Sequence, residues 1–312
     1  MKKLNKNTYK EIRNWMMHHA RLLEMSLWKY YFEDGSKEDV VNILQTYQNE
    51  DGGFGQALEA DNWNPMSTPI TTYEAIMTLE HIGYEDMNAP IYQGIKKYIS
   101  SGQGRHDHGW KFCIESNDGY PHAPWWEYNE EVAVKSGNCV TAGLCVFIIK
   151  HMSDDQKEYR QALEYIKHIV EKIELEEQSE LMVKAYLTLL TVEDILKGEG
   201  IELESKKERI SELVMQTIEH DTSKWPYYTT RPSCYISGPN SPYYEANKEI
   251  VQQELDYLID TKPEGDVWPI TWSWFNTQDK YPKEFAVSEV WWKGVRVIEA
   301  LRLLEGYGRI EK

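Results

Sequence analysis

The 312-residue chain contains no apolar run that approaches the roughly 18 residues needed to cross a bilayer. The residues after Met1-Lys2-Lys3-Leu4 are polar, so the basic start is not followed by the apolar segment of a signal peptide. The four cysteines form no Cys-x-x-Cys pair, and a disulfide framework is not expected in a large chain without a signal peptide. These absences predict a cytoplasmic protein with no membrane span.

Basic residues are fewer than acidic ones, 34 against 51, and the formal net charge is −17. A surface of this sign repels phosphate backbones and anionic headgroups, which argues against nucleic acid and anionic membrane as partners. The expected partner is a small-molecule substrate, either apolar or a carbohydrate. Single basic side chains could still bind one anionic group, and the candidates are Arg105, Lys111, Lys224 and Arg231.

The sequence lacks a P-loop and a dinucleotide fingerprint. The glycines of Gly52-Gly53-Phe54-Gly55 follow a helical pattern and not a strand, which excludes the Rossmann context. No nucleophile elbow surrounds Ser233 or Ser241. We therefore predict no cofactor.

Helical periodicity is abundant. Apolar residues recur at three-and-four spacing from Ile12 to Leu23, and Ser36 with Asp39 predicts a helix N-cap with an acidic first turn. No convincing run of alternating strands occurs, so we predict an all-α fold built from paired antiparallel helices. The further helices are predicted near residues 69–82, 88–100, 130–150, 155–173, 179–197, 204–220, 244–260 and 284–305.

Three segments interrupt the helical pattern: 101–128, 221–243 and 261–283. Loops of this length are often functional, and these are rich in Gly, Pro and aromatic residues. Linkers between domains favour Ser, Gly and charge instead. We therefore expect packed loops within a single domain that covers residues 1–312.

One short motif recurs along the chain. Asp51-Gly52-Gly53-Phe54 is echoed by Asp107-His108-Gly109-Trp110, and more loosely at 221–225 and 264–268. Acid, glycine and aromatic residues at such intervals are typical of an array of supersecondary units, here helical hairpins.

The stretch from Gln48 to Gly55 resembles the repeat of terpenoid cyclases, including squalene–hopene cyclases, and of protein prenyltransferase β-subunits. The family pattern is roughly Q-x-x-D-G-G-F/W-G, placed after one helix and before the next. The resemblance implies an α/α toroid, in which paired helices surround a central cavity. It also implies a structural role for Gln48 and Phe54, which would fasten neighbouring helices.

The chemistry of these families has no matching motif here. The aspartate-rich D-x-D-D string of the squalene–hopene type is absent, and no cysteine lies in a context that matches the prenyltransferase zinc motif. Asp154-Asp155 lies closest to a diphosphate-binding motif, but Ser153 and Gln156 predict a capping box at a helix start there.

Candidate catalytic residues follow the motif directly. Glu59 and Asp61 lie beside Trp63, and a carboxyl group against an aromatic wall would have a raised pKa and could serve as a general acid. His122 is the candidate base. The alternative is that both acids are solvated loop residues or helix caps, because Ser67-Thr68-Pro69 already indicates a helix start.

The tryptophans are the candidate substrate-binding residues. Rigid aromatic surfaces stack on sugars, enclose isoprenoid chains and stabilise positive charge. The alternative is that these loops are plugs in the core. The candidates are Trp63, Trp110, Trp125, Trp126, Trp268, Trp272 and Trp274.

His106, His108 and Cys113 form the densest set of metal-ligand types, but their spacing matches no standard motif. We predict no metal site.

The leading hypothesis is a terpenoid-cyclase/prenyltransferase-like protein that binds or transforms an isoprenoid-like molecule in an aromatic-lined cavity. A carbohydrate-active α/α toroid, either a glycoside hydrolase or a lyase, is the first alternative. A non-catalytic helical scaffold that binds a peptide or protein is the second. The sequence leaves the substrate and the reaction open.

Overall fold

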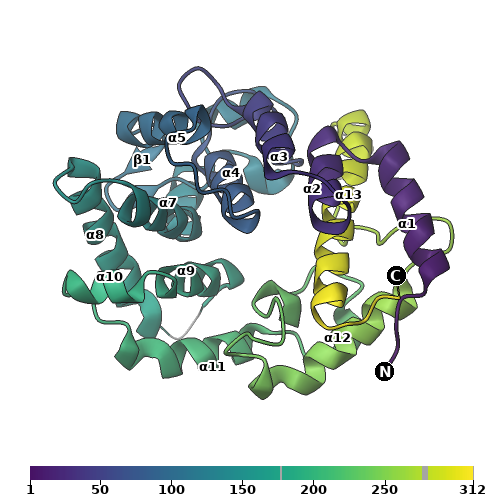
Figure 1. Cartoon of the computed structure of the whole chain (residues 1–312). Coiled ribbons are helices and arrows are strands. Elements are labelled where there is room, and N and C mark those ends of the chain that lie inside the picture. Colours follow the sequence, from purple (N-terminus) through teal and green to yellow (C-terminus); the bar gives the residue numbers. More distant parts are fainter. Residues whose placement is uncertain (176–177, 276–279, 312) are drawn as a thin grey trace. The chain divides into compact units, whose positions relative to one another are not determined.

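The computed structural model describes residues 1–175, 178–275 and 280–311. Within these residues the chain forms thirteen α-helices and one two-stranded antiparallel ladder, β1 (Arg105–His106) with β2 (Gly109–Trp110) (Figure 1). The all-α prediction is confirmed. The chain divides into two compact units, Met1–Ile43 with Val214–Lys312 (unit 1) and Leu44–Leu213 (unit 2). The expectation of a single domain stays a prediction.

Unit 1 brings the two ends of the chain together. Leu4 pairs in parallel with Ile310, and the Leu4 amide donates to the carbonyl of Arg309 over 2.8 Å. Helix α13 packs against α1, α2 and α12 (Figure 1). The elements of unit 1 are α1 (Lys6–His19), α2 (Leu22–Phe32), α3 (Lys37–Leu44, which ends in unit 2), η6 (Thr222–Lys224), η7 (Pro232–Cys234), η8 (Glu245–Asn247), α12 (Lys248–Thr261) and α13 (Pro282–Gly306).

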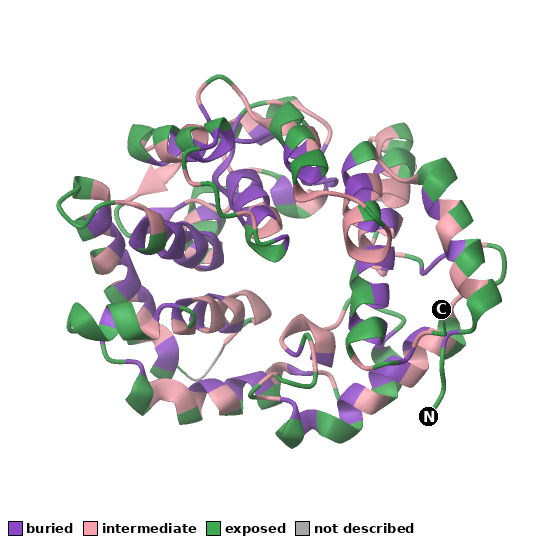
Figure 2. Ribbon diagram, in the orientation of Figure 1, coloured by how far each residue is buried: buried purple, intermediate pink, exposed green. Residues whose placement is uncertain are grey.

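Unit 2 is organised around α7. Every residue of α7 from Cys139 to Ile149 is buried, as expected for a helix that is apolar on all sides (Figure 2). It packs against α4, α8 and α9. The elements are η1 (Gln45–Tyr47), α4 (Pro69–His81), α5 (Pro90–Ser101), η2 (Glu115–Gly119), η3 (Pro124–Trp126), α6 (Glu130–Ser136), α7 (Asn138–His151), α8 (Lys157–Val170), η4 (Glu171–Glu174), α9 (Glu180–Leu190), α10 (Glu193–Gly198), η5 (Glu204–Lys206) and α11 (Lys207–Thr217, which ends in unit 1).

Several predicted helices are divided. The helix expected at 130–150 is α6 and α7, which bend by 52° at Gly137. The helix expected at 179–197 is α9 and α10, and the stripe from Ile12 to Leu23 covers α1 and α2. At Gly137 a Cβ atom would lie 2.1 Å from the carbonyl of Trp110, so a close backbone approach fixes this break.

The capping predictions have two outcomes. Ser36 and Asp39 are confirmed as a reciprocal pair, because the Asp39 amide donates to the Ser36 hydroxyl over 3.1 Å. The capping box at Ser153 is wrong, since α8 begins at Lys157 with Gln156 as the residue before it. The Ser153 hydroxyl donates instead to Asp155 over 2.6 Å and forms a turn ahead of the helix.

In the part of the chain that the structure describes, no single helix combines the length and apolarity needed to cross a bilayer. The bent pair α6 and α7 meets these two criteria only when its helices are taken together.

Candidate functional site

The Gln48–Gly55 motif forms a tight loop against α5 of unit 2. The Gln48 side chain donates to the carbonyl of Gly52 over 2.9 Å and to the carbonyl of Ile91 over 3.0 Å. Gly52 has φ +92°, and a Cβ atom there would lie 2.1 Å from the carbonyl oxygen of Gly94. Phe54 is fully buried. These contacts confirm that Gln48 and Phe54 have a structural role.

Residues of the same motif form hydrogen bonds with the far end of the segment that follows it, residues 55–67. Asp51 accepts from the Gly53 amide over 2.9 Å and from the Ser67 hydroxyl over 2.6 Å. Asn49 donates from its side chain to the carbonyl of Pro65 over 2.9 Å. The two ends of the segment 55–67 are therefore fastened together, and the candidate acids lie between them.

A contact that sequence reasoning missed joins the motif aromatic to the next helix. The Phe54 amide donates to the hydroxyl of Thr72 over 3.1 Å, and the Trp110 amide donates to the hydroxyl of Thr141 over 2.9 Å. Thr72 and Thr141 are each the fourth residue of their helix, α4 and α7. The number of residues between the aromatic residue and its threonine partner differs between the two copies of the motif. A fixed sequence spacing therefore does not identify the threonine.

Two segments of unit 2, one with the candidate acids and one with the candidate base, pair through their backbones. The Trp63 amide donates to the carbonyl of Pro121 over 2.9 Å, and the Ala123 amide donates to the carbonyl of Asp61 over 2.8 Å. Asn62 therefore lies opposite His122 in an antiparallel bridge, in the pairing that places Cα atoms about 4.5 Å apart.

The candidate titratable residues are all buried. Glu59 is 4 % exposed, and Asp61 and His122 are each 1 % exposed. The interpretation of Glu59 and Asp61 as solvated loop acids is therefore wrong. Thr68 provides the N-cap of α4, because its hydroxyl accepts from the Thr71 amide.

His122 has a defined tautomer. Its Nδ1 lies 2.6 Å from the carbonyl oxygen of Tyr120. A carbonyl oxygen only accepts hydrogen bonds, so Nδ1 carries the proton. In the neutral ring Nε2 is then the basic nitrogen, which is the form a general base needs.

A buried amide network supports these two segments. The side chains of Asn62 and Asn64 both donate to the side-chain oxygen of Asn117, over 3.2 and 2.9 Å. Asn117 donates in turn to the carbonyl of Trp126 over 3.1 Å. All three asparagines are buried, and the network fixes the loop that carries His122.

The tryptophans of unit 2 differ in exposure. Trp110 is 1 % exposed and lies edge-on to Tyr165 with ring centroids 5.7 Å apart. Trp126 is 4 % exposed and stacks on Phe112 at 4.8 Å. Trp63 is half-buried, and Trp125 is 40 % exposed. Of the four, Trp125 offers the largest free surface.

The tryptophans of unit 1 pack against separate neighbours. Trp268 is buried and donates from its indole N–H to the carbonyl of Leu258 over 2.8 Å. Trp274 is fully buried, with Phe285 5.9 Å away, and Trp272 lies edge-on to Trp292 at 5.2 Å. Their role as substrate-binding residues stays a prediction.

The histidine and cysteine set of 106–113 makes local contacts. His108 stacks on His168 with ring centroids 4.2 Å apart, and the Cys113 thiol donates to the carbonyl of Glu127 over 3.7 Å. Burial lowers the pKa of His106 and raises the pKa of the Cys113 thiol. Across the described residues, no group of three or more His, Cys, Asp or Glu side chains is placed to hold a metal ion.

Two open grooves lie elsewhere. One of about 630 Å³ follows η8 and the first part of α12, from Glu245 to Asp256, and one of about 370 Å³ is lined by residues that include Lys96, Lys97 and His151. Neither is lined by a predicted site residue. Comparisons with protein families, curated proteins and solved structures find no match to this chain.

Proposed function

We propose that this protein is a terpenoid-cyclase/prenyltransferase-like α/α toroid that binds an isoprenoid-like small molecule and acts on it by acid–base chemistry. One observation carries the proposal: Glu59, Asp61 and His122 are all buried, and the segment with the two acids pairs through its backbone with the segment that carries His122. Buried acids and a buried base on neighbouring segments are the residue types that proton transfer requires.

Each residue has a role in this proposal. Glu59 or Asp61, both buried, would donate a proton to a double bond of the substrate. The Nε2 atom of His122 would then remove a proton from a neighbouring carbon. One proton enters and one leaves, so the net reaction is an isomerisation or cyclisation with atoms and charge conserved.

The repeat supports the toroid part of the proposal. Both copies of the motif in unit 2 fasten their aromatic residue to the fourth residue of a following helix. Helices α7, α8 and α9 pack on one another, as neighbouring hairpins of such an array would. Trp63 and Trp125, which keep exposed surface, would line the ligand cavity.

The test begins with the protein as purified. Native mass spectrometry should detect a co-purifying apolar molecule, and calorimetry should detect binding of at least one prenyl alcohol or prenyl diphosphate. Binding of oligosaccharides alone would replace the proposal with the carbohydrate-active alternative. Binding of neither class would leave the non-catalytic scaffold as the explanation and end both enzyme proposals.

Variants then test the roles. Glu59→Gln, Asp61→Asn and His122→Gln should each lower turnover of the identified ligand by at least about tenfold, the usual scale for a general acid or base. Glu85→Gln, at an exposed carboxylate of the same unit, is the matched control. Equal turnover in all four variants would contradict the assigned roles, and far-UV circular dichroism would verify that each variant is folded.

A further inference from the structure

Four basic residues stood out in the sequence as possible partners of an anionic group, and three of them form hydrogen bonds or ion pairs within the protein. Arg105 donates to the side chain of Gln161 and to the carbonyl of Ile99. Lys111 pairs with Glu130 over 2.6 Å, and Lys224 pairs with Glu219 over 3.0 Å. The fourth, Arg231 of unit 1, is different.

The side chain of Arg231 is only 11 % exposed. Among the described residues its guanidinium group has no hydrogen-bond partner, and its nearest acid is Glu254 at 3.7 Å. It also lies 5.9 Å from the ring centroid of Tyr257. A guanidinium group has five N–H donors, and donors without hydrogen-bond acceptors in a nearly buried position cost free energy.

Other buried arginines of unit 1 show what a structural role looks like. Arg309 donates to the carbonyl of Lys2 and to the side chains of Gln252 and Asp256. Arg21 makes two hydrogen bonds with Glu24, over 2.8 and 2.6 Å. In both cases the protein itself supplies acceptors for the guanidinium fork, which it does not do for Arg231.

Glu254 does not fill this gap, because its oxygens are engaged elsewhere. One accepts from the Ser233 amide over 2.8 Å and the other from the Ser233 hydroxyl over 2.6 Å. Burial raises the pKa of Glu254 despite the opposing charges of Arg231 and Arg296. The Ser233 amide and hydroxyl thus lie at hydrogen-bond distance from this carboxyl group, whereas the nearest Arg231 nitrogen stays 3.7 Å away.

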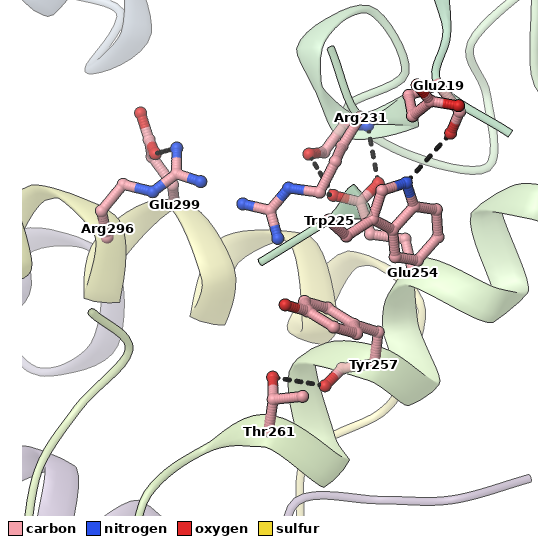
Figure 3. A network of polar contacts seen from close by, with 9 residues as sticks. Glu219, Trp225, Arg231, Glu254, Tyr257, Thr261, Arg296 and Glu299 are labelled. Atoms are coloured by element: carbon pink, nitrogen blue, oxygen red, sulfur yellow. Dashed lines mark hydrogen bonds and ion pairs between the residues drawn. The ribbon is translucent and has the colours of Figure 1, made fainter. Parts of the chain in front are cut away.

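A second arginine faces the first. Figure 3 shows the guanidinium groups of Arg231 and Arg296 pointing toward one another, with Arg296 projecting from α13. One guanidinium nitrogen of Arg296 donates a hydrogen bond to the carboxylate of Glu299 over 2.9 Å, and the Arg296 side chain is 28 % exposed. Two cations directed at one place repel each other unless an anion lies between them.

We propose that Arg231 and Arg296 form a binding site for a small oxyanion, a carboxylate or a phosphoryl group. The planar fork of a guanidinium group matches the paired oxygens of both ligands, and charge-assisted bonds of this kind are among the stronger ones in proteins. The partial exposure of Arg296 gives the anion access from solvent. This site lies within unit 1 and does not depend on the proposed function.

Calorimetry on the full chain tests the site. Sodium phosphate and sodium acetate are titrated separately at constant ionic strength in chloride, because salt screens such interactions. At least one of the two should bind with a stoichiometry near one, and the pair identifies which chemistry the site prefers. If neither binds, the proposal is overturned.

Variants locate the binding. Arg231→Lys and Arg296→Lys keep the charge but lose the fork, and each should weaken binding at least tenfold. Arg302→Lys changes an exposed arginine of the same helix α13 and should leave binding unchanged. Equal weakening in all three variants would place the anion elsewhere and contradict the proposal.

A measurement on the unmodified chain covers the case in which a variant does not fold. Phenylglyoxal modifies accessible arginines, and mass spectrometry of the digested protein reports the extent at each position. The binding anion should slow modification at Arg296 at least threefold and leave Arg302 unaffected. Absence of protection at Arg296 would overturn the proposal.

Discussion

The backbone amide of Phe54 donates a hydrogen bond of 3.1 Å to the hydroxyl of Thr72, and both residues are fully buried. Trp110 and Thr141 repeat this relationship in the second copy of the motif. The motif thus fastens a loop to the first turns of a helix through the main chain of its aromatic residue. The Phe54 ring contributes by its burial, and the Phe54 amide contributes by its hydrogen bond to Thr72.

Replacing Thr72 with Val should lower the free energy of unfolding by about 1–3 kcal/mol, because the buried Phe54 amide loses its only hydroxyl partner among the described residues. Thr141→Val should have an effect of the same size at Trp110. Urea denaturation measures both.

Thr78→Val on α4 is the matched control. The Thr78 hydroxyl donates to the carbonyl of Glu74 within its own helix, so its loss leaves no amide unpaired. The expected change is within about 0.5 kcal/mol. A control as destabilised as Thr72→Val would show that the exchange of a hydroxyl for a methyl group within α4, and not the unpaired Phe54 amide, is the cause.

The close approach of the motif to α5 gives a second prediction. Gly94→Ala would place a Cβ atom 2.2 Å from the side-chain nitrogen of Gln48, and Gly52→Ala would both strain a residue at φ +92° and collide with the Gly94 carbonyl. Each should cost about 2 kcal/mol or more of unfolding free energy. Gly119→Ala in the same unit meets no atom within 4 Å and should change the melting temperature little. A melting temperature for Gly52→Ala equal to that of Gly119→Ala would contradict the close approach.

The sequence predicted those parts of the fold that depend on neighbouring residues. Thr68 before Pro69, and Ser36 before Asp39, mark helix starts because capping is a local hydrogen-bond pattern. The break at Gly137 was missed, since it depends on the approach of the Trp110 carbonyl from another segment.

The candidate site shows the same limit. Acid, aromatic and glycine residues indicated Glu59 and Asp61, but their burial and the position of His122 depend on a strand-like pairing between distant segments. Arg231 was visible as a basic residue, whereas its lack of acceptors and its orientation toward Arg296 are tertiary facts. Local patterns therefore named most participants, and tertiary packing decided which of them meet.

Alanine substitutions at the two adjacent tryptophans of η3 should lower the free energy of unfolding by different amounts. Trp126→Ala should lower the free energy of unfolding by about 3–5 kcal/mol, because it removes a buried ring that stacks on Phe112. Trp125→Ala should cost less than about 1 kcal/mol, since the ring is 40 % exposed. Thermal and urea denaturation of the two single variants make the comparison. Similar losses in both would mean that the Trp125 ring is held as firmly as its neighbour.

The last prediction concerns pH. Burial raises the pKa of Glu254 above its ordinary value of 4.5, so between these two values the folded chain binds more protons than the unfolded chain. The contribution of Glu254 to stability is fully present below pH 4.5 and is lost as the pH rises through the raised pKa. Glu254→Gln removes the ionisation, so the unfolding free energy of the unmodified chain minus that of the variant should fall as the pH rises above 4.5. Urea titrations in cationic buffers with chloride, free of oxyanions, measure this difference.

Asp221 supplies a control of opposite sign. Hydrogen bonds from the hydroxyl and amide of Ser223 lower the pKa of Asp221 below its ordinary value of 3.8. Its contribution is present above pH 3.8 and is lost as the pH falls through the lowered value, so Asp221→Asn should alter the curve at the acidic end. The two variants therefore act in different pH ranges and in opposite directions. A Glu254→Gln difference that stays flat from pH 4.5 to 8 would mean that Arg231 and Arg296 outweigh burial and hold the carboxylate ionised, which would also make Glu254 their counterion and weaken the case for an external anion.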